Sequence, residues 1–223
     1  MSISYSNFLT QIRNYTEVDS QVLTDSIISE FLRNVELDVA GKVDYDDLRK
    51  YADSVFTANN KYLSLPADCL ITRQVLVATT AGGSLSSGSV EYIELRDQSF
   101  IREYNSSGST GLPKFYGNWD DFTLIVAPTP NVAYPVQLEY IKEPPHFSST
   151  TNTYLSTYQE NVLLYGTLVE AFSYLKGPMD MYNLYKTKYD TAVQSFALQQ
   201  MGRRRREEYA DGVPRIKIDS PSP

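Results

Sequence analysis

Few residues in this sequence are of the types that carry catalysis, and they are scattered. His146 is the single histidine, so the chain has no second imidazole for a metal cluster and no nearby nucleophile to complete a triad. Glu91 and Glu94 lie in a predicted strand, where a spacing of three places their carboxylates on opposite faces. They are therefore not the facing acid pair of a glycosidase.

Two further patterns resemble binding motifs but are incomplete. Asp44, Asp46 and Asp47 have the composition of a calcium loop, yet the glycine at the required offset and the closing glutamate are missing. Gly82-Gly83 and 108–111 are followed by neither Lys-Ser/Thr nor a GxGxxG pattern, so no phosphate cradle is present. We predict no catalytic residue, no cofactor site and no metal site, and hence a protein that is not an enzyme.

The overall composition limits the class of protein. The 223 residues are 42% hydrophobic, enough for a core of ordinary size in one compact body or two closely packed subdomains. Cys69 is the only cysteine and cannot form an internal disulfide; we expect a small buried side chain there. Neither a membrane-spanning run nor a signal peptide is evident, which predicts a soluble protein that is intracellular as made and does not contact membranes.

Charge and aromatic content point to protein partners. The formal net charge of −7 makes the chain a poor candidate for wrapping nucleic acid, because affinity for phosphates depends on clustered Lys and Arg. The 18 tyrosines suit partly wet protein–protein contacts, although a tyrosine-rich core explains them equally well.

Hydrophobic periodicity divides the chain into segments with helical and strand patterns. Helical spacing occurs over 4–15, from a cap at Asp19 or Ser20 to Gly41, and over about 157–176 and 179–208. A period of two predicts a hairpin of 54–57 with 61–65 around an Asn-rich turn, followed by strands 71–79, 90–95, 114–117, 122–126 and 136–141. Asp97 is a candidate cap for a short helix that carries Phe100, Ile101 and Tyr104.

These segments predict an α+β fold, an α-helical bundle with an inserted antiparallel β-domain and an extended C-terminal tail. The predicted boundaries are 1–50 for the N-terminal helices of the bundle, 51–145 for the β-domain, 155–210 for two long helices and 211–223 for the tail. The Ser/Gly-rich loops at 81–89 and 105–111 are either plain hairpin tips or arms that become ordered only against a neighbour.

Two C-terminal features are candidates for contacts with partners. The run Arg203–Arg206 is either a solvated helix end, whose cations complement the helix dipole, or a contact with an acidic protein surface or with DNA phosphates. The remainder of the chain is acidic, which favours a protein. Residues 213–218 alternate in polarity and form either a frayed terminus or a strand that adds to another chain's sheet edge.

The order of several motifs resembles tailed-phage head–tail adaptor, or connector, proteins. The matching motifs are Asn60-Lys61-Tyr62-Leu63-Ser64-Leu65-Pro66-Ala67-Asp68, Val90-Glu91-Tyr92-Ile93, Gly111-Leu112-Pro113-Lys114-Phe115-Tyr116 and Leu124-Ile125-Val126-Ala127-Pro128-Thr129-Pro130. A helix that contains Leu163-Leu164-Tyr165-Gly166-Thr167-Leu168-Val169-Glu170-Ala171 follows. The resemblance covers about 54–200, and the two Ser/Gly loops depart from the family pattern.

This resemblance implies a structural protein of the virion, located at the head–tail junction and made in the host cytoplasm. It implies a ring of twelve copies beneath the portal protein, joined to tail tube, nozzle or fibre proteins, with DNA passing through during genome ejection without specific binding. The portal-binding candidates are then Arg203, Arg204, Arg205, Arg206, Val213, Arg215, Ile216, Lys217 and Ile218. The candidates for contact within the ring or with the tail are Tyr182, Tyr185, Tyr189 and Trp119.

One alternative from another class is a receptor- or carbohydrate-binding module of the tail. Trp119 falls between Asn118 and Asp120 in a predicted hairpin turn, where its ring and neighbouring tyrosines could stack on sugars. Loss of glycan binding on Trp119→Ala would favour that alternative.

Overall fold

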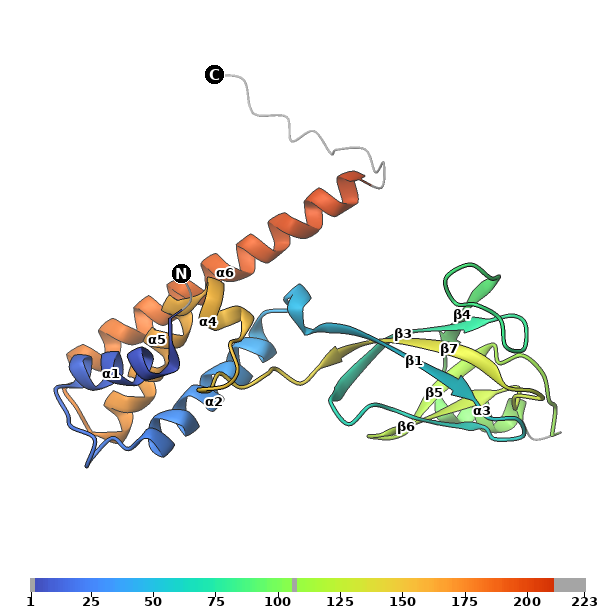
Figure 1. The fold of residues 1–223 in the computed structure, drawn as a ribbon, viewed down its shortest axis with the longest axis horizontal. Helices are drawn as coiled ribbons and strands as arrows, with labels where there is room; N and C mark the ends of the chain where they lie inside the picture. The colour runs from blue at the N-terminus through green and yellow to red at the C-terminus, as the bar shows by residue number, and fades with distance from the viewer. Residues whose placement is uncertain (1–2, 106–107, 211–223) are drawn as a thin grey trace, which may run out of the picture. The chain divides into compact units, whose positions relative to one another are not determined.

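The computed structural model describes residues 3–105 and 108–210, with side chains as far as Gly202. Its internal contacts divide the chain into two compact units. The first, the helical unit, comprises 1–46 and 144–223; the second, the β unit, comprises 47–143 (Figure 1).

The helical unit is organised around a short buried helix, α5. Its described helices are α1 (Tyr5–Thr16), α2 (Asp25–Lys42), α4 (Tyr154–Tyr158), α5 (Glu160–Tyr174) and α6 (Met179–Ala210). Helix α5 contacts all four others. Its buried positions lie on most of its circumference, so the predicted central helix at 157–176 is confirmed, with a break at Gly177-Pro178 before α6.

Helix α2 begins later than the capping residues predicted. Its N-cap is Thr24, whose hydroxyl accepts the N–H of Ile27 at 3.4 Å. Asp19 instead accepts the N–H of Gln21 at 2.9 Å and stabilises the turn that precedes the helix. Both are residues with short polar side chains, and sequence alone does not distinguish an N-cap from an Asx turn at this spacing.

The β unit is a seven-stranded sheet with the order β1-β7-β3-β4-β5-β6-β2. The short 3₁₀ turn η1 (Asp46–Leu48) lies at the start of the unit. The strands are β1 (Arg49–Phe56), β2 (Tyr62–Ser64), β3 (Cys69–Ala78), β4 (Val90–Leu95), β5 (Phe115–Asp120), β6 (Thr123–Ala127) and β7 (Tyr134–Lys142). Alternate side chains of these strands point inward and form one core, which includes Phe56, Val75, Val77, Leu124 and Val136.

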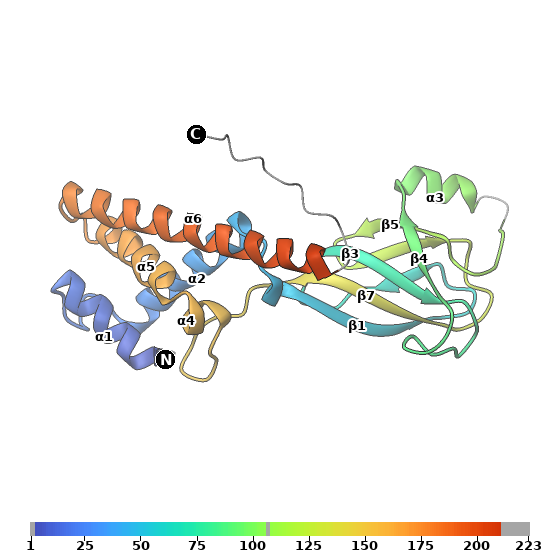
Figure 2. The ribbon, with the colours of Figure 1, turned by 90° about the horizontal axis from the view of Figure 1, so that it is seen from above.

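The predicted fold class is wrong. The chain is a mixed α/β protein with a nearly closed, barrel-like sheet and six α-helices among the described residues, rather than a helical bundle with an inserted antiparallel β-domain. Strands β4 and β5 run parallel, because α3 (Gln98–Tyr104) returns the chain to the end of the sheet from which β4 started. Figure 2 shows α3 beside β4 and β5.

The predicted hairpin between 54–57 and 61–65 is also wrong. Both segments are strands, but β1 pairs along its whole length with β7, and β2 pairs with β6. Residues 57–61 therefore connect the two ends of the sheet order rather than two hydrogen-bonded neighbours. Adjacent strands with an Asn-rich connection have the sequence pattern of a hairpin, and only the long-range pairing excludes it.

The first Ser/Gly loop is held by its own hydrogen bonds. The hydroxyl of Ser84 accepts the backbone N–H groups of Ser86 and Ser87 at 3.3 and 3.2 Å, and Gly88 N–H donates to the Ser84 carbonyl at 2.9 Å. The N–H of Thr79 donates to the Ser89 carbonyl at 3.0 Å and closes the loop. The loop is thus ordered by local turns within the chain itself.

Candidate assembly surfaces

The motif Asn60–Asp68 ends in Asp68, whose carboxylate forms a brace between the turn before β3 and strands β1 and β7. Asp68 accepts hydrogen bonds from the Lys50 ammonium on β1 at 2.8 Å and from the Tyr140 hydroxyl on β7 at 2.9 Å. The hydrogen bond from Lys50 holds the pKa of Asp68 below its ordinary value. The pKa of Tyr140 is raised, mainly by burial and to a smaller extent by its hydrogen bond to Asp68. The brace fixes the turn before β3 to β7, which neighbours β3 in the sheet, and to β1 beyond it.

Removing the Tyr140 hydroxyl tests this brace. Tyr140→Phe is expected to lower the free energy of unfolding of the β unit by about 1 kcal/mol, because one hydrogen bond to a carboxylate is lost. Chemical denaturation followed by the fluorescence of Trp119, which lies in this unit, measures it. Tyr51→Phe is the matched control, since the Tyr51 side chain is 60% exposed on the same sheet; an equal loss in both variants would contradict the brace.

The later motifs converge on the end of β6 and also have an architectural role. Gly111 N–H donates to the Thr129 carbonyl at 2.8 Å, and Lys114 N–H to the Ala127 carbonyl at 2.9 Å. Asn59 N–H donates to the Pro130 carbonyl at 2.7 Å. The Ala127–Pro128 peptide bond is cis. These hydrogen bonds hold the loops at the end of β6 to the sheet.

Helix α3 and strand β5 present an aromatic cluster. The rings of Phe100, Tyr104 and Phe115 lie within 5.2–5.9 Å of one another, and the Arg96 guanidinium lies 5.6 Å from the Phe100 ring. A Cβ on Gly117 would lie 2.7 Å from the Arg96 carbonyl, so a glycine is required where the β4–α3 connection crosses β5. Phe100 and Tyr104 remain 39% and 41% exposed, which leaves a partly open surface suited to protein contact.

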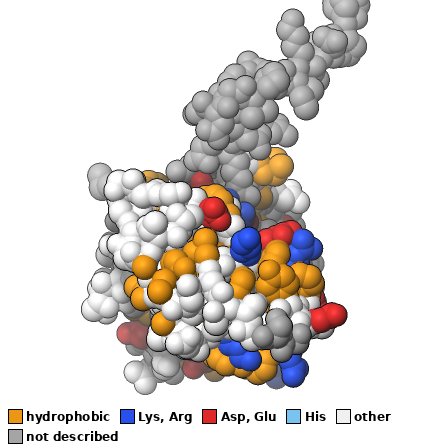
Figure 3. Space-filling view, turned by 90° about the vertical axis from the view of Figure 1, so that its right-hand side faces the viewer, with side chains coloured by type: hydrophobic (Ala, Val, Ile, Leu, Met, Phe, Trp, Pro, Cys, Tyr) orange, Lys and Arg blue, Asp and Glu red, His pale blue; other side chains and the backbone are white. Residues whose placement is uncertain are grey.

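The outer face of β1, β7, β3 and β4 is a second surface, and it carries exposed aromatic and aliphatic side chains. Tyr51 and Val55 of β1 and Tyr92 of β4 are 60%, 52% and 70% exposed. Asp53 lies between the two β1 residues and accepts a hydrogen bond from Gln137 of β7 at 2.8 Å. Figure 3, which looks onto the β unit, shows hydrophobic side chains in patches among charged ones.

Trp119 lies within β5 and not in a turn; the hairpin tip is formed by Asp121 and Phe122. Its ring is 39% exposed and meets the Tyr62 ring edge to face, with the centroids 5.3 Å apart. The two rings are tilted by 61° and form no continuous flat platform for a sugar. Contact of Trp119 with a ring neighbour or with the tail stays a prediction.

The tyrosines predicted for ring contact are divided between core and surface of the helical unit. Tyr185 and Tyr189 of α6 are buried, with 5% and 7% exposure, and Tyr182 is half-buried. The Tyr189 hydroxyl donates to Asp38 of α2 at 2.6 Å, and Lys42 donates to the same carboxylate at 2.6 Å. The two buried rings thus hold α6 against its own unit and are not available on its surface.

The contact between Asp38 and Tyr189 shifts the pKa values of both side chains. Partial burial acts to raise the pKa of Asp38, but the hydrogen bonds from Lys42 and Tyr189 outweigh it and bring that pKa below its ordinary value. Burial and the neighbouring carboxylate raise the pKa of the Tyr189 phenol well above its ordinary range. At neutral pH the phenol is therefore a fixed donor to an ionised acceptor, a structural and not a catalytic pair.

The C-terminal candidates fall at the edge of the described chain or beyond it. Arg203, Arg204, Arg205 and Arg206 lie within α6, and their side chains are outside the described part. Val213, Arg215, Ile216, Lys217 and Ile218 lie outside the described residues altogether.

One buried polar cluster was missed by sequence analysis. Glu36 of α2 is fully buried and accepts hydrogen bonds from His146 Nδ1 at 2.8 Å and from the Phe147 N–H at 2.7 Å. His146 Nε2 lies 2.9 Å from the Ser29 hydroxyl. The order Ser29, His146, Glu36 reproduces the connectivity of a catalytic triad, but Ser29 lies inside a helix whose own turns engage its backbone N–H.

Instead, the cluster anchors the segment that returns to the helical unit. Arg33 donates to the Pro144 carbonyl at 2.7 Å, and the buried Phe147 ring meets Tyr5 and Phe8 at 5.5 and 5.8 Å. Pro144, His146 and Phe147 are thus held on α1 and α2. A pair 110 residues apart in sequence, such as Glu36 and His146, leaves no local signal.

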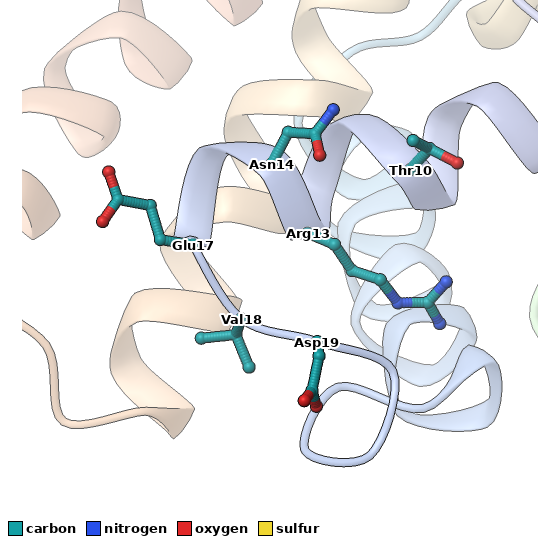
Figure 4. Close-up of a pocket in the computed structure, with 6 residues that line it drawn as sticks. All are labelled: Thr10, Arg13, Asn14, Glu17, Val18 and Asp19. Atoms are coloured by element: carbon teal, nitrogen blue, oxygen red, sulfur yellow. The ribbon is translucent and has the colours of Figure 1, made fainter.

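The residues that line a shallow hollow at the end of α1 do not form a recognisable catalytic arrangement. Figure 4 shows its lining, Thr10, Arg13, Asn14, Glu17, Val18 and Asp19. The Arg13 guanidinium donates to the Leu23 carbonyl at 3.0 Å and pairs with Asp25, so it is used to fix the α1–α2 connection. Among the described residues no group of three or more His, Cys, Asp or Glu is placed to hold a metal ion.

The comparison with known families decides between the adaptor and the alternatives. The SU10 adaptor protein family matches residues 3–215, almost the whole sequence. The chain belongs to the SU10 adaptor protein family. This is a phage head-to-tail adaptor family, so the resemblance seen in the motifs is confirmed. Among curated proteins, none matches the chain.

Membership gives the adaptor its general role. It is a structural phage protein and a virion component, and it interacts with other phage structural proteins. None of the helices described in the adaptor is long and apolar enough to cross a membrane. Cys69 is buried, and burial raises the pKa of its thiol, as expected of a core side chain.

Proposed function

We propose that this adaptor assembles into a ring, of twelve copies as the family resemblance implies, that joins the portal vertex to the tail and lines the DNA exit channel. The observation that carries the proposal is the family match over residues 3–215. A ring contact is heterologous, so two different faces of each copy must be complementary.

The distribution of charge supports this assignment. The first 202 residues contain 23 acidic and 14 basic side chains, whereas 203–223 contain six basic and four acidic ones. An acidic body that lines a channel repels the DNA backbone and lets it slide, while a basic C-terminal region suits an acidic protein surface. We therefore assign the portal contact to Arg203–Arg206 and to the segment Val213–Ile218.

The outward side of α6 is suited to contact a neighbouring copy. Opposite its buried stripe, this helix presents Thr187, Thr191 and Leu198, with Leu198 69% exposed. Each threonine hydroxyl donates at 2.9 Å to the carbonyl four residues earlier, which satisfies the polar group within the helix. An uncharged helix stripe of this kind can be buried without desolvating a charge. Tyr182 and Trp119 are the partly exposed aromatic candidates for the same role.

Truncation tests the portal assignment. A variant that ends at Gly212 is expected to bind the portal protein of the same phage at least about tenfold more weakly than the full chain, a loss of about 1.4 kcal/mol. Removing only residues 219–223 is the matched control and is expected to leave affinity unchanged. Equal affinity of the full chain and both truncated variants would show that the tail does not contribute to portal binding.

The ring itself needs a separate measurement. Electron microscopy of the adaptor bound to portal is expected to show a closed ring with a central channel. Single adaptor copies attached to portal, without adaptor–adaptor contacts, would contradict the ring.

A further inference from the structure

The two ends of the seven-stranded sheet leave a gap in the barrel. Among the described strands, β1 pairs only with β7, and β2 pairs only with β6. Alternate residues of β1 therefore direct their backbone N–H and C=O groups to an edge that has no strand partner among the described residues. Such an edge is a template for an additional strand.

A cleft of about 230 Å³ lies between these two edges. Its walls come from 52–54 of β1 and from 63–66, at and after the end of β2, and its floor includes the core residues Val136 and Leu138 of β7. The side chain of Asp53 is on the outer face of β1, between the exposed Tyr51 and Val55. A strand added here would place one row of side chains on an apolar floor and the other row beside an acidic group.

The C-terminal segment has the matching alternation. In an extended strand, Ile216 and Ile218 would point to one face, and Arg215 and Lys217 would point to the other. With the isoleucines over the floor, both cations lie on the outer side near Asp53. A slip by one residue would bury both cations in the apolar cleft, so the register is strongly selected. Pro214, which has no N–H, falls at the start of this strand, where a proline is tolerated.

We infer that the segment Val213–Ile218 of one adaptor copy adds as a strand to the β1–β2 gap of a neighbouring copy. The inference rests on the proposed ring and describes the adaptor before portal engages the same segment. The occupant is a second copy because a ring, which the proposed function requires, brings neighbouring copies into contact.

Disulfide trapping between two full-length variants tests the strand and its register. One variant carries Ser54→Cys and a mass tag; the other carries one added cysteine at 215, 216, 217 or 218, and both retain Cys69. After mixing without portal and mild oxidation, we expect crosslinked heterodimers from Ile216→Cys and Ile218→Cys, and loss of the crosslink for Arg215→Cys and Lys217→Cys. Wild-type chain mixed with the Ser54→Cys variant controls for reaction with the buried Cys69.

Self-association provides a second measurement. Ile216→Asp with Ile218→Asp is expected to weaken association by at least about tenfold in sedimentation experiments. The control, Ser220→Asp with Ser222→Asp, adds the same charge outside the segment and is expected to have no effect.

The outcomes separate this inference from the proposed function. Crosslinks of equal strength at all four positions, or no crosslink at any of them, would overturn the inference. If a ring on portal is still seen in that case, the proposed function stands; if that ring is also absent, both fail.

Discussion

Replacing Glu36 by leucine is expected to lower the free energy of unfolding of the helical unit by about 3 kcal/mol. Glu36 is fully buried, and its two carboxylate oxygens accept from His146 and from the Phe147 N–H. Leucine fills much of the volume but leaves both donors without an acceptor in a buried site. Thermal denaturation followed by far-ultraviolet circular dichroism should show a midpoint lower by roughly 6–12 °C.

Glu30→Leu is the matched control for this substitution. Glu30 lies on the same helix with an exposed side chain, and its replacement is expected to change stability by less than about 0.5 kcal/mol. Equal effects at the two positions would show that the cluster contributes nothing specific.

The Glu36 site also predicts a pH dependence. Burial raises the pKa of Glu36 above its ordinary 4.5, although the hydrogen bonds from His146 and Phe147 and the charges of His146 and Arg33 oppose this. The folded state then holds the proton more tightly than the unfolded state, so this carboxyl favours folding below pH 4.5 and loses that contribution as pH rises through the raised pKa. The stability difference between wild type and Glu36→Leu should decrease from pH 4.5 upward; an increase would contradict the assignment.

Gly166→Ala is expected to destabilise the helical unit by about 2 kcal/mol, although alanine has a higher helix propensity than glycine. Position 166 is in α5 where α2 and α6 pass closest to it. An added Cβ would lie 2.6 Å from Val35 Cγ1 and 2.9 Å from Tyr189 Cε2, and both neighbours are buried. The propensity gain of about 1 kcal/mol does not offset this overlap in a close-packed interior.

The same substitution at Gly41 should have the opposite sign. Gly41 is in α2 with nothing within 4 Å of an added Cβ, so Gly41→Ala is expected to stabilise by about 0.5–1 kcal/mol. Chemical denaturation of both variants measures the contrast. Val35→Ala combined with Gly166→Ala should be less destabilising than the sum of the single changes by at least about 0.5 kcal/mol, since it removes the nearer overlap. Strict additivity would place the cause elsewhere.

Local patterns predicted the elements better than their partners. The helix over 157–176 and the cap at Asp97 were readable because apolar spacing and a short acidic side chain act within a few residues. The family was equally readable, because its motifs keep their order along the chain. The sequence identified Asp68 as part of a family motif, but it did not predict that Asp68 accepts hydrogen bonds from Lys50 and Tyr140.

The sequence by itself thus determined the types of most segments, the acidic charge, the lack of a recognisable catalytic motif and the family. Only the tertiary structure decided that β1 pairs with β7 and not with β2, that β4 and β5 are parallel, and that Tyr185 and Tyr189 are buried. It also placed His146 between Ser29 and Glu36. The physical reason is that strand pairing, burial and buried hydrogen bonds join residues up to 151 positions apart, as in Asp38 and Tyr189, and such contacts have no local period from which to infer them.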